Sequence, residues 1–457
     1  MPYGASVDTS LPVAEPTTPA SISLSEALRF WLKLGFISFG GPAGQIALMH
    51  EELVERRRWI SERRFLHALN YCMLLPGPEA QQLATYIGWL MHRTWGGILA
   101  GGLFVLPSLF IIMGLSWLYM AHGDVPVVAG IFYGIKPAVT ALVVQAAYRV
   151  GSRTLRNGWL WGIAIAAFVA IFALSVPFPL IVAVAAMAGY AGGRLKPEAF
   201  SGAGAHGKLN ASAPASSAVI DDNTPTPPHA RFSWGHLVKV CVTFVAIWTV
   251  ALGLLAAVYG FDAVLVQMGW FFTKAALMTF GGAYAVLPYV YQGAVDQFQW
   301  LTAPQSMDGL ALGETTPGPL IMVVSFVAYV GGWTKAIFGE DSLALGGAVA
   351  ATVVTFFTFL PSFFFILLGG PFIESTHGNL KFTAPLTAIT AAVVGVIANL
   401  AVFFAYHVLW PNGVAGRFDW TSLLLGLAAA VALIRYKIGV VPVIAAAGLL
   451  GLLVRMV

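Results

Sequence analysis

The sequence predicts an all-α, multi-pass membrane protein built from two inverted repeats, and three observations lead to this fold class. Of the 457 residues, 58% are hydrophobic and only 10% are charged, whereas soluble domains carry about 25% charged residues. Apolar runs such as 98–121 and 344–368 exceed the ~20 residues that a helix needs to cross a bilayer. A set of motifs in the first half also returns in the second half at a constant distance.

Hydrophobic segments fill most of the chain, and two polar stretches divide it. Residues 1–22 and 195–236 are rich in Ser, Ala, Pro, Gly and Thr, a composition that cannot bury a core. We therefore expect a disordered tail (1–22), a first repeat (23–194), a flexible cytoplasmic linker (195–236), a connecting transmembrane helix (237–260) and a second repeat (261–457). The thirteen hydrophobic segments span 26–49, 66–92, 97–121, 125–148, 158–175, 178–193, 237–259, 264–290, 306–333, 344–369, 382–409, 421–435 and 438–456.

The repeated unit keeps one ungapped register, with an offset of 241 residues. Chance does not explain a register held over about fifty residues. After a gap, Leu106–Ser108 also matches Leu360–Ser362. Internal duplication is common among secondary transporters, whose substrate site lies near the midplane between the repeats. The repeated positions are Phe30, Lys33, Phe39, Gly40, Gly41, Trp59, Pro76, Gly77 and Pro78, which recur as Phe271, Lys274, Phe280, Gly281, Gly282, Trp300, Pro317, Gly318 and Pro319.

Arginine placement orients the two repeats. The loop 50–65 carries five arginines, whereas its counterpart 291–305 carries no Lys or Arg. The positive-inside rule places the first loop in the cytoplasm and the second outside. A single connecting helix at 237–260 would produce this inversion. We expect the stretch 50–64 to form one amphipathic helix with the pairs Glu52–Arg56 and Arg58–Glu62, which caps the cytoplasmic face or concentrates a dianion there.

Helix breakers interrupt the first two segments of each repeat, at Gly40–Pro42 and Pro76–Pro78 in the first. Such breaks are tolerated at membrane depth where they are buried in protein or line a wet cavity, so we expect broken or re-entrant segments; thirteen full spans remain the alternative. Free backbone N–H groups after a break attract anions. The helices after Pro42, Pro78, Gly282 and Pro319 would thus aim at a common centre, unless these residues only permit close packing.

Three lysines lie in apolar sequence. Lys33 and Lys274 each precede a Gly-Gly pair by seven residues, and Lys136 follows Gly134. A lysine at the bilayer centre costs at least ~2.5 kcal/mol, so it usually faces a pathway. The alternative is that each lysine extends its amine to nearby headgroups.

Polar side chains gather around the breaks. Amide and hydroxyl donors suit an oxyanion, and a carboxylate suits proton coupling, so Glu79 and Glu314 are candidates for the latter. Hydrogen bonds between helices are the alternative for each. The donors are Gln45, Gln81, Gln82, Thr315 and Thr316.

Several function classes are disfavoured. A net charge of +4 is too small to indicate nucleic acid as a partner. The two cysteines, Cys72 and Cys241, lie in apolar stretches and suggest neither a disulfide nor a metal site. No recognisable catalytic motif occurs, so we expect no enzyme and no cofactor. The first 25 residues contain no Lys or Arg, so no cleavable signal peptide is expected.

The sequence resembles the chromate ion transporter family, in its long two-domain bacterial form. The resemblance implies export of chromate from the cytoplasm, chromate resistance and an inner-membrane location. The motifs that carry it are Ser38–Pro42, Leu75–Pro78 with Gln81 and Gln82, Phe104–Ser108, Thr279–Pro288 and Glu314–Pro319. The second half departs from the first at Ala283, in place of Pro42, and at Leu320, in place of Glu79, so the halves need not contribute equally to a site.

Three rival functions stay open at this point. Sulfate has the shape and charge of chromate, and nothing in the sequence separates the two anions. A membrane-embedded enzyme is disfavoured by the absence of a catalytic cluster, and a purely structural protein by charged, broken segments that repeat in register. The coupling ion, the direction of transport and the existence of a homodimer are left undecided by the sequence.

Overall fold

The computed structural model describes residues 22–39, 41–123, 125–200, 218–221, 224–225, 227–280, 282–375 and 383–456. Within these ranges the chain is all-helical, with one isolated β-bridge. The predicted tail 1–22 therefore lies outside the described residues except for Ile22. Helices of the first half are α1 (Leu24–Ile37), α2 (Gly41–His50), the π-helix η1 (Glu51–Arg56), α3 (Glu62–Cys72), α4 (Glu79–His122), α5 (Pro126–Thr154), α6 (Gly158–Leu174), α7 (Phe178–Leu195) and α8 (Pro197–Phe200).

The second half follows a short 3-10 turn, η2 (Pro228–Ala230), and the long helix α9 (Trp234–Tyr259). Almost none of the central residues of α9 are buried, so its apolar surface faces lipid. The remaining helices are α10 (Val264–Leu277), α11 (Ala283–Tyr291), the π-helix η3 (Gln292–Gln297), α12 (Ala303–Thr315), η4 (Leu320–Met322), α13 (Val323–Thr334), η5 (Glu340–Ser342), α14 (Leu343–Ser375), α15 (Thr383–Leu409), α16 (Trp420–Ile434) and α17 (Val440–Met456).

The helices are long and apolar enough for a multi-pass membrane protein. Six of those described meet the length and hydropathy needed to span a bilayer, and five more are apolar but shorter. The longest, α4, is two helices joined at a sharp bend, because Arg93 has a φ of 58°. The six are α4, α5, α7, α9, α14 and α15, and the five are α6, α10, η4–α13, α16 and α17.

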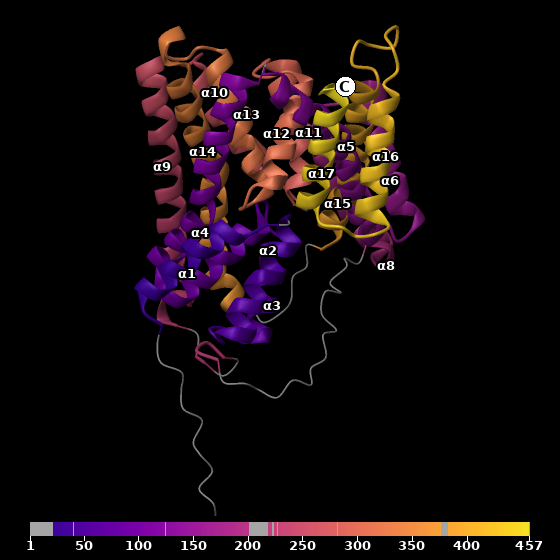
Figure 1. Ribbon diagram of the computed structural model, residues 1–457. Coiled ribbons are helices and arrows are strands. Elements are labelled where there is room, and N and C mark those ends of the chain that lie inside the picture. The colour runs from indigo at the N-terminus through magenta and orange to yellow at the C-terminus, as the bar shows by residue number, and fades with distance from the viewer. Residues whose placement is uncertain are drawn as a thin grey trace, which may run out of the picture.

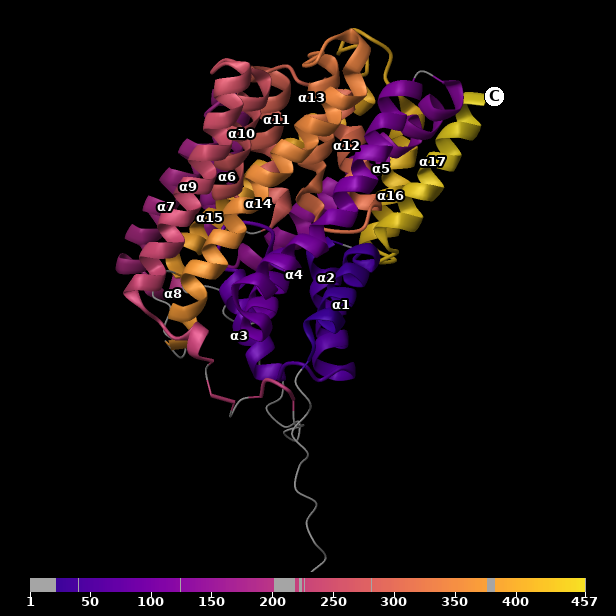
Figure 2. The same ribbon diagram turned by 90° about the vertical axis from the view of Figure 1, so that its left-hand side faces the viewer.

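The duplication predicted from the sequence is repeated in the backbone. The π-helices η1 and η3 begin 241 residues apart, at Glu51 and Gln292, and have the same length. Both views place α1, α2 and α3 toward the lower end of the molecule, whereas α10, α11 and α12 lie toward the upper end (Figures 1 and 2). Positive φ angles recur in the same register, at Gly41, Arg58 and Gly77 and again at Gly282, Gln299 and Gly318.

The two halves interlock. Helix α5 of the first half contacts α16 and α17 of the second, and α15 of the second half contacts α6 and α7 of the first. These helices form one bundle, and in Figure 1 α11, α12 and α13 lie between this bundle and α9, α10 and α14. Helices α4 and α14 contact each other, whereas α11 and α12 connect the bundle to the broken segments through their contacts with α15 and α5. A site at the centre is therefore built from both halves.

The prediction of a single helix over 50–64 is wrong. The chain turns between η1 and α3, and Arg58 adopts a φ of 53°. The turn buries Trp59 and Ile60, which gains more free energy than continuing an exposed helix. The ion pair Glu52–Arg56 forms at 2.8 Å, whereas Glu62 pairs with His50 instead of Arg58.

The segment expected to be a linker has ends that contact the first half. Ile220 forms the β-bridge with Ile60, and Arg64 donates a hydrogen bond to the carbonyl of Thr224. His229 bonds to the carbonyl of Trp89 at 3.0 Å. Residues 201–217, in the middle of the expected linker, lie outside the described residues.

Candidate functional site

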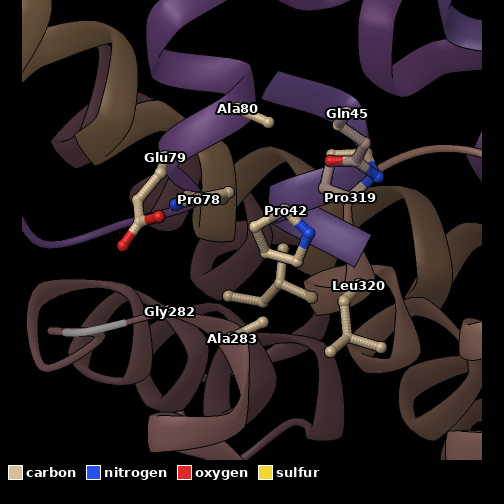
Figure 3. A pocket seen from close by; sticks show the side chains of 10 residues that line it. Pro42, Gln45, Pro78, Glu79, Ala80, Gly282, Ala283, Pro319 and Leu320 are labelled. Atoms are coloured by element: carbon tan, nitrogen blue, oxygen red, sulfur yellow. The ribbon is translucent and has the colours of Figure 1, made fainter. Parts of the chain in front are cut away.

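The helices that follow the four breaks meet at one cavity. The N-termini of α2, α4 and α11 and the start of η4 each contribute residues to its wall. Figure 3 shows Pro42 in the middle of the group, with Glu79 to its left, Ala283 below it and Leu320 to its lower right. The lining residues are Pro42, Gln45, Pro78, Glu79, Ala80, Gly282, Ala283, Pro319, Leu320 and Ile321.

Two equivalent hydrogen bonds join the halves at this centre. The N–H of Gly77 donates to the carbonyl of Thr279 at 2.8 Å, and the N–H of Gly318 donates to the carbonyl of Ser38 at 2.9 Å. Gly77 and Gly318 have φ angles of 129° and 99°, a region that residues with a Cβ rarely adopt. Each glycine therefore lets its loop turn toward the other half.

Glutamine side chains stabilise the broken loops. Gln45 Nε2 donates to the carbonyl of Gly318 at 2.5 Å, across the halves. Gln82 Nε2 donates to the carbonyl of Pro76 at 2.8 Å, and Gln81 Nε2 donates to the hydroxyl of Thr85 at 3.0 Å. All three glutamines are buried, and their Oε1 atoms have no hydrogen-bond partner among the described residues.

Two serines missed by the sequence analysis pack against the glycines. Ser108 and Ser362 are buried, and their hydroxyls have no hydrogen-bond partner within the described ranges. A Cβ built on Gly77 would lie 2.6 Å from Ser362 Oγ, and one on Gly318 would lie 3.0 Å from Ser108 Oγ. Each serine thus lies against the loop of the opposite half. The repeated Leu-Pro-Ser motif was the signal that could have identified them.

The candidate carboxylates differ in surroundings. Glu79 is the first residue of α4 and lines the cavity. Glu314 is buried near the end of α12 and accepts a hydrogen bond from Tyr284, the second residue of α11. No sequence pattern pairs Tyr284 with Glu314, because only the fold brings α11 beside α12.

The two threonines beside Glu314 use their hydroxyls within the helix. Thr315 Oγ1 donates to the carbonyl of Ala311 at 3.0 Å, and Thr316 Oγ1 donates to the carbonyl of Gly313 at 3.2 Å. Neither residue lines the cavity in this conformation.

The three candidate lysines lie away from the cavity wall. Lys33 and Lys274 are exposed on the protein surface, and the amine of Lys274 lies 5.7 Å from the ring centroid of Trp270. Lys136 forms an ion pair with Asp308 at 3.5 Å. Phe39, next to the first break, is also exposed, whereas its neighbour Gly40 and the equivalent Gly281 lie outside the described residues.

Four helix starts direct their partial positive charge at the centre, beside the carboxyl group of Glu79, but the cavity lacks the room for an oxyanion. Each helix N-terminus carries about +0.5 of an elementary charge, which low dielectric makes more effective. The cavity has space for about one water molecule, whereas a tetrahedral oxyanion has five heavy atoms. This conformation is therefore closed around the centre, and a bound oxyanion requires the surrounding helices to separate.

Comparisons with known proteins agree with the repeated architecture. A sequence profile described as "Chromate transporter" matches residues 25–190 and again residues 266–452, two segments that also begin 241 residues apart. No solved structure matches the chain.

Relatives of similar length occur in several bacteria. A "Chromate transport protein" of Pseudomonas aeruginosa is 33% identical over 95% of this chain and 94% of its own length. A protein of the same description from Cupriavidus metallidurans is 28% identical over 95% of this chain and 94% of its own. A "Probable chromate transport protein" of Synechococcus elongatus is 28% identical over 91% of each chain.

Proposed function

This chain belongs to the chromate transporter family, a family of transporters and not of enzymes, and we propose that it carries chromate across the inner membrane of a bacterium. The support for chromate is the description of relatives that match nearly the whole chain. The support for an anion is the meeting of four helix N-termini at one centre, and this observation carries the proposal.

The proposed topology has two inverted repeats with re-entrant segments. In each half, the helices before and between the breaks, α1 to α3 and α10 to α12, stay at one end of the molecule (Figure 1), which supports hairpins that enter and leave on the same face. We assign the end with α1, α2 and α3 to the cytoplasm, because the loop 50–65 carries five arginines and 291–305 carries none. The connecting helix α9 then crosses the bilayer between the halves.

The proposed substrate site lies at the cavity. Chromate would replace its hydration with backbone N–H groups at the four helix starts and with the glutamine side chains beside them. A divalent oxyanion needs more positive charge than helix ends supply, and Lys33 and Lys274 are the proposed source. Both lysines are exposed, and in this proposal the faces of α1 and α10 that carry them border the path of the anion to the cavity.

The proposed direction is export coupled to proton movement. Glu79 at the cavity wall and Glu314 with Tyr284 are the candidate proton carriers. The arginines of the loop 50–65 would raise the concentration of the dianion at the cytoplasmic entrance. Sulfate remains the rival substrate, since it shares the shape and charge of chromate.

Uptake into inverted membrane vesicles tests the proposal. We expect energised vesicles to accumulate radioactive chromate, excess sulfate to compete weakly and a protonophore to abolish accumulation. Vesicles with Gly318→Leu, which fills the centre, are the inactive control. Uptake of sulfate in preference to chromate would make sulfate the substrate. No uptake of either oxyanion would contradict the proposal.

A further inference from the structure

An ionic cluster around a buried carboxylate joins the two halves near the upper end of the molecule. Asp308 of α12 is buried and pairs with the amine of Lys136 of α5 at 3.5 Å. The hydroxyl of Tyr119, near the end of α4, donates to the same carboxylate oxygen at 2.9 Å. Asp308 comes from the second half and both partners come from the first. We call Asp308, Lys136 and Tyr119 the upper latch.

A second cluster of the same chemistry joins the halves near the lower end. Glu374, near the end of α14, accepts a hydrogen bond from the hydroxyl of Tyr86 at 2.5 Å. Arg64 of α3 approaches the other carboxylate oxygen at 3.8 Å. The carboxylate again comes from the second half, and the cation and the tyrosine again come from the first. We call Glu374, Arg64 and Tyr86 the lower latch.

The latches occupy related places in the two repeats. Helices α3 and α12 are equivalent in the 241-residue register, and each supplies one charged residue, Arg64 or Asp308. Each latch also uses the end of a long helix, α14 below and α4 above. The two ends are at opposite sides of the molecule (Figure 1).

Both latches are incompletely satisfied. Asp308 Oδ1 is a buried atom without a hydrogen-bond partner among the described residues, and Arg64 Nη1 meets Glu374 only as an ion pair, beyond hydrogen-bond distance. Removing charges from water costs about as much as pairing them returns, even in well-bonded pairs. A latch with an unmade hydrogen bond is therefore close to balance, and water entering on that side would stabilise the separated charges. Such a contact suits a junction that opens and closes rather than a permanent attachment.

We propose that the upper and lower latches are the two gates of the transport cycle, each controlling access to the cavity from its own face. This inference rests on the proposed function only in taking the cavity as the transported ion's site. With both latches formed, the cavity is too small for an oxyanion. Parting the lower latch loosens the contact of α3 with α14 and admits solvent from the arginine-rich side. Parting the upper latch frees α12 from α5 and α4 and admits solvent from the other side.

Accessibility of a cysteine at the cavity tests the gates without any substrate. Ala80 lines the cavity and is buried, so Ala80→Cys is the reporter, in full-length protein with Cys72→Ala and Cys241→Ala. A membrane-impermeant maleimide is applied to spheroplasts and to inverted vesicles. We expect Glu374→Gln to speed labelling about fivefold or more from the lower, arginine-rich face only, and Asp308→Asn to do so from the upper face only.

Controls separate gating from damage. Glu340→Gln removes an exposed carboxylate just before α14 and should leave labelling unchanged from both faces. Exchanging the upper pair, as Lys136→Asp with Asp308→Lys, should restore slow labelling. If Glu374→Gln does not insert, Tyr86→Phe tests the lower latch more gently by removing one hydrogen bond. Unchanged labelling, or labelling that rises equally from both faces, overturns the inference. Failure to transport chromate with one-sided labelling intact would overturn the proposed substrate instead.

Discussion

Adding one methyl group to either central glycine should destabilise the protein and stop transport. At Gly77, a Cβ would lie 2.6 Å from both Gln82 Nε2 and Ser362 Oγ, and at Gly318 it would lie 2.6 Å from Ser108 Cβ. Both distances are far inside ordinary contact. Both residues also have positive φ angles, which a side chain disfavours.

The size of the effect follows from these two costs. Holding a non-glycine residue in a sparsely populated backbone region costs about 1–3 kcal/mol. Overpacking a filled site by one methyl costs typically ~1–3 kcal/mol more. We therefore expect Gly77→Ala and Gly318→Ala each to lower the free energy of unfolding by about 2–6 kcal/mol. Leucine at either position should abolish chromate uptake even where the protein still inserts, because it fills the centre.

Alanine at two other glycines separates the cost of a positive φ angle from the cost of overpacking. Gly282 has a φ of 99° but nothing within 4 Å of an added methyl group, so Gly282→Ala carries only the backbone cost. Gly102, inside α4, has open space and an ordinary helical φ, so Gly102→Ala should be neutral or slightly stabilising. Thermal melting of purified protein in detergent should rank Gly102→Ala highest, Gly282→Ala next and the two central variants lowest. If Gly77→Ala and Gly318→Ala melt at or above the melting temperature of Gly282→Ala, the packing argument is refuted.

Three further predictions concern orientation, charge and pH. Single cysteines at Arg57 and Gln297 should react with an impermeant thiol reagent from opposite faces, and equal labelling from outside would disprove the inverted arrangement. Lys33→Met and Lys274→Met should each lose chromate uptake at normal membrane abundance, whereas an arginine at either position should keep part of it. Uptake at the parental rate by both methionine variants would mean that the two lysines are surface anchors. Burial lowers the pKa of His229 below its usual value, so His229 is protonated more easily when the turn η2 has separated from Trp89. Its docking should therefore weaken as pH falls below about 6.5, seen as rising mobility of an adjacent nitroxide label in the parent but not in His229→Gln.

The membrane class and the duplication could be predicted from the sequence, because both depend on composition and register. Few charges and long apolar runs exclude a water-facing surface, whatever the fold. A constant offset of 241 residues required only that the motifs be compared. The same register appears in the positive φ angles of Gly77 and Gly318 and in the paired π-helices. The prediction of one helix over 50–64 failed because burial of Trp59 and Ile60 outweighed local helix propensity.

Partners across the halves were decided only by the tertiary structure. Lys136 was noticed as a charge in apolar sequence, but its pairing with Asp308 depends on α5 lying beside α12. Ser108 and Ser362 belonged to a repeated motif, yet their place against the opposite loop follows from how the halves interlock. The chemistry of a charged or hydroxyl side chain determines which kinds of group it can bond. Which group it meets is set by the packing of helices hundreds of residues apart, since that packing minimises exposed backbone and unpaired charge for the whole chain at once.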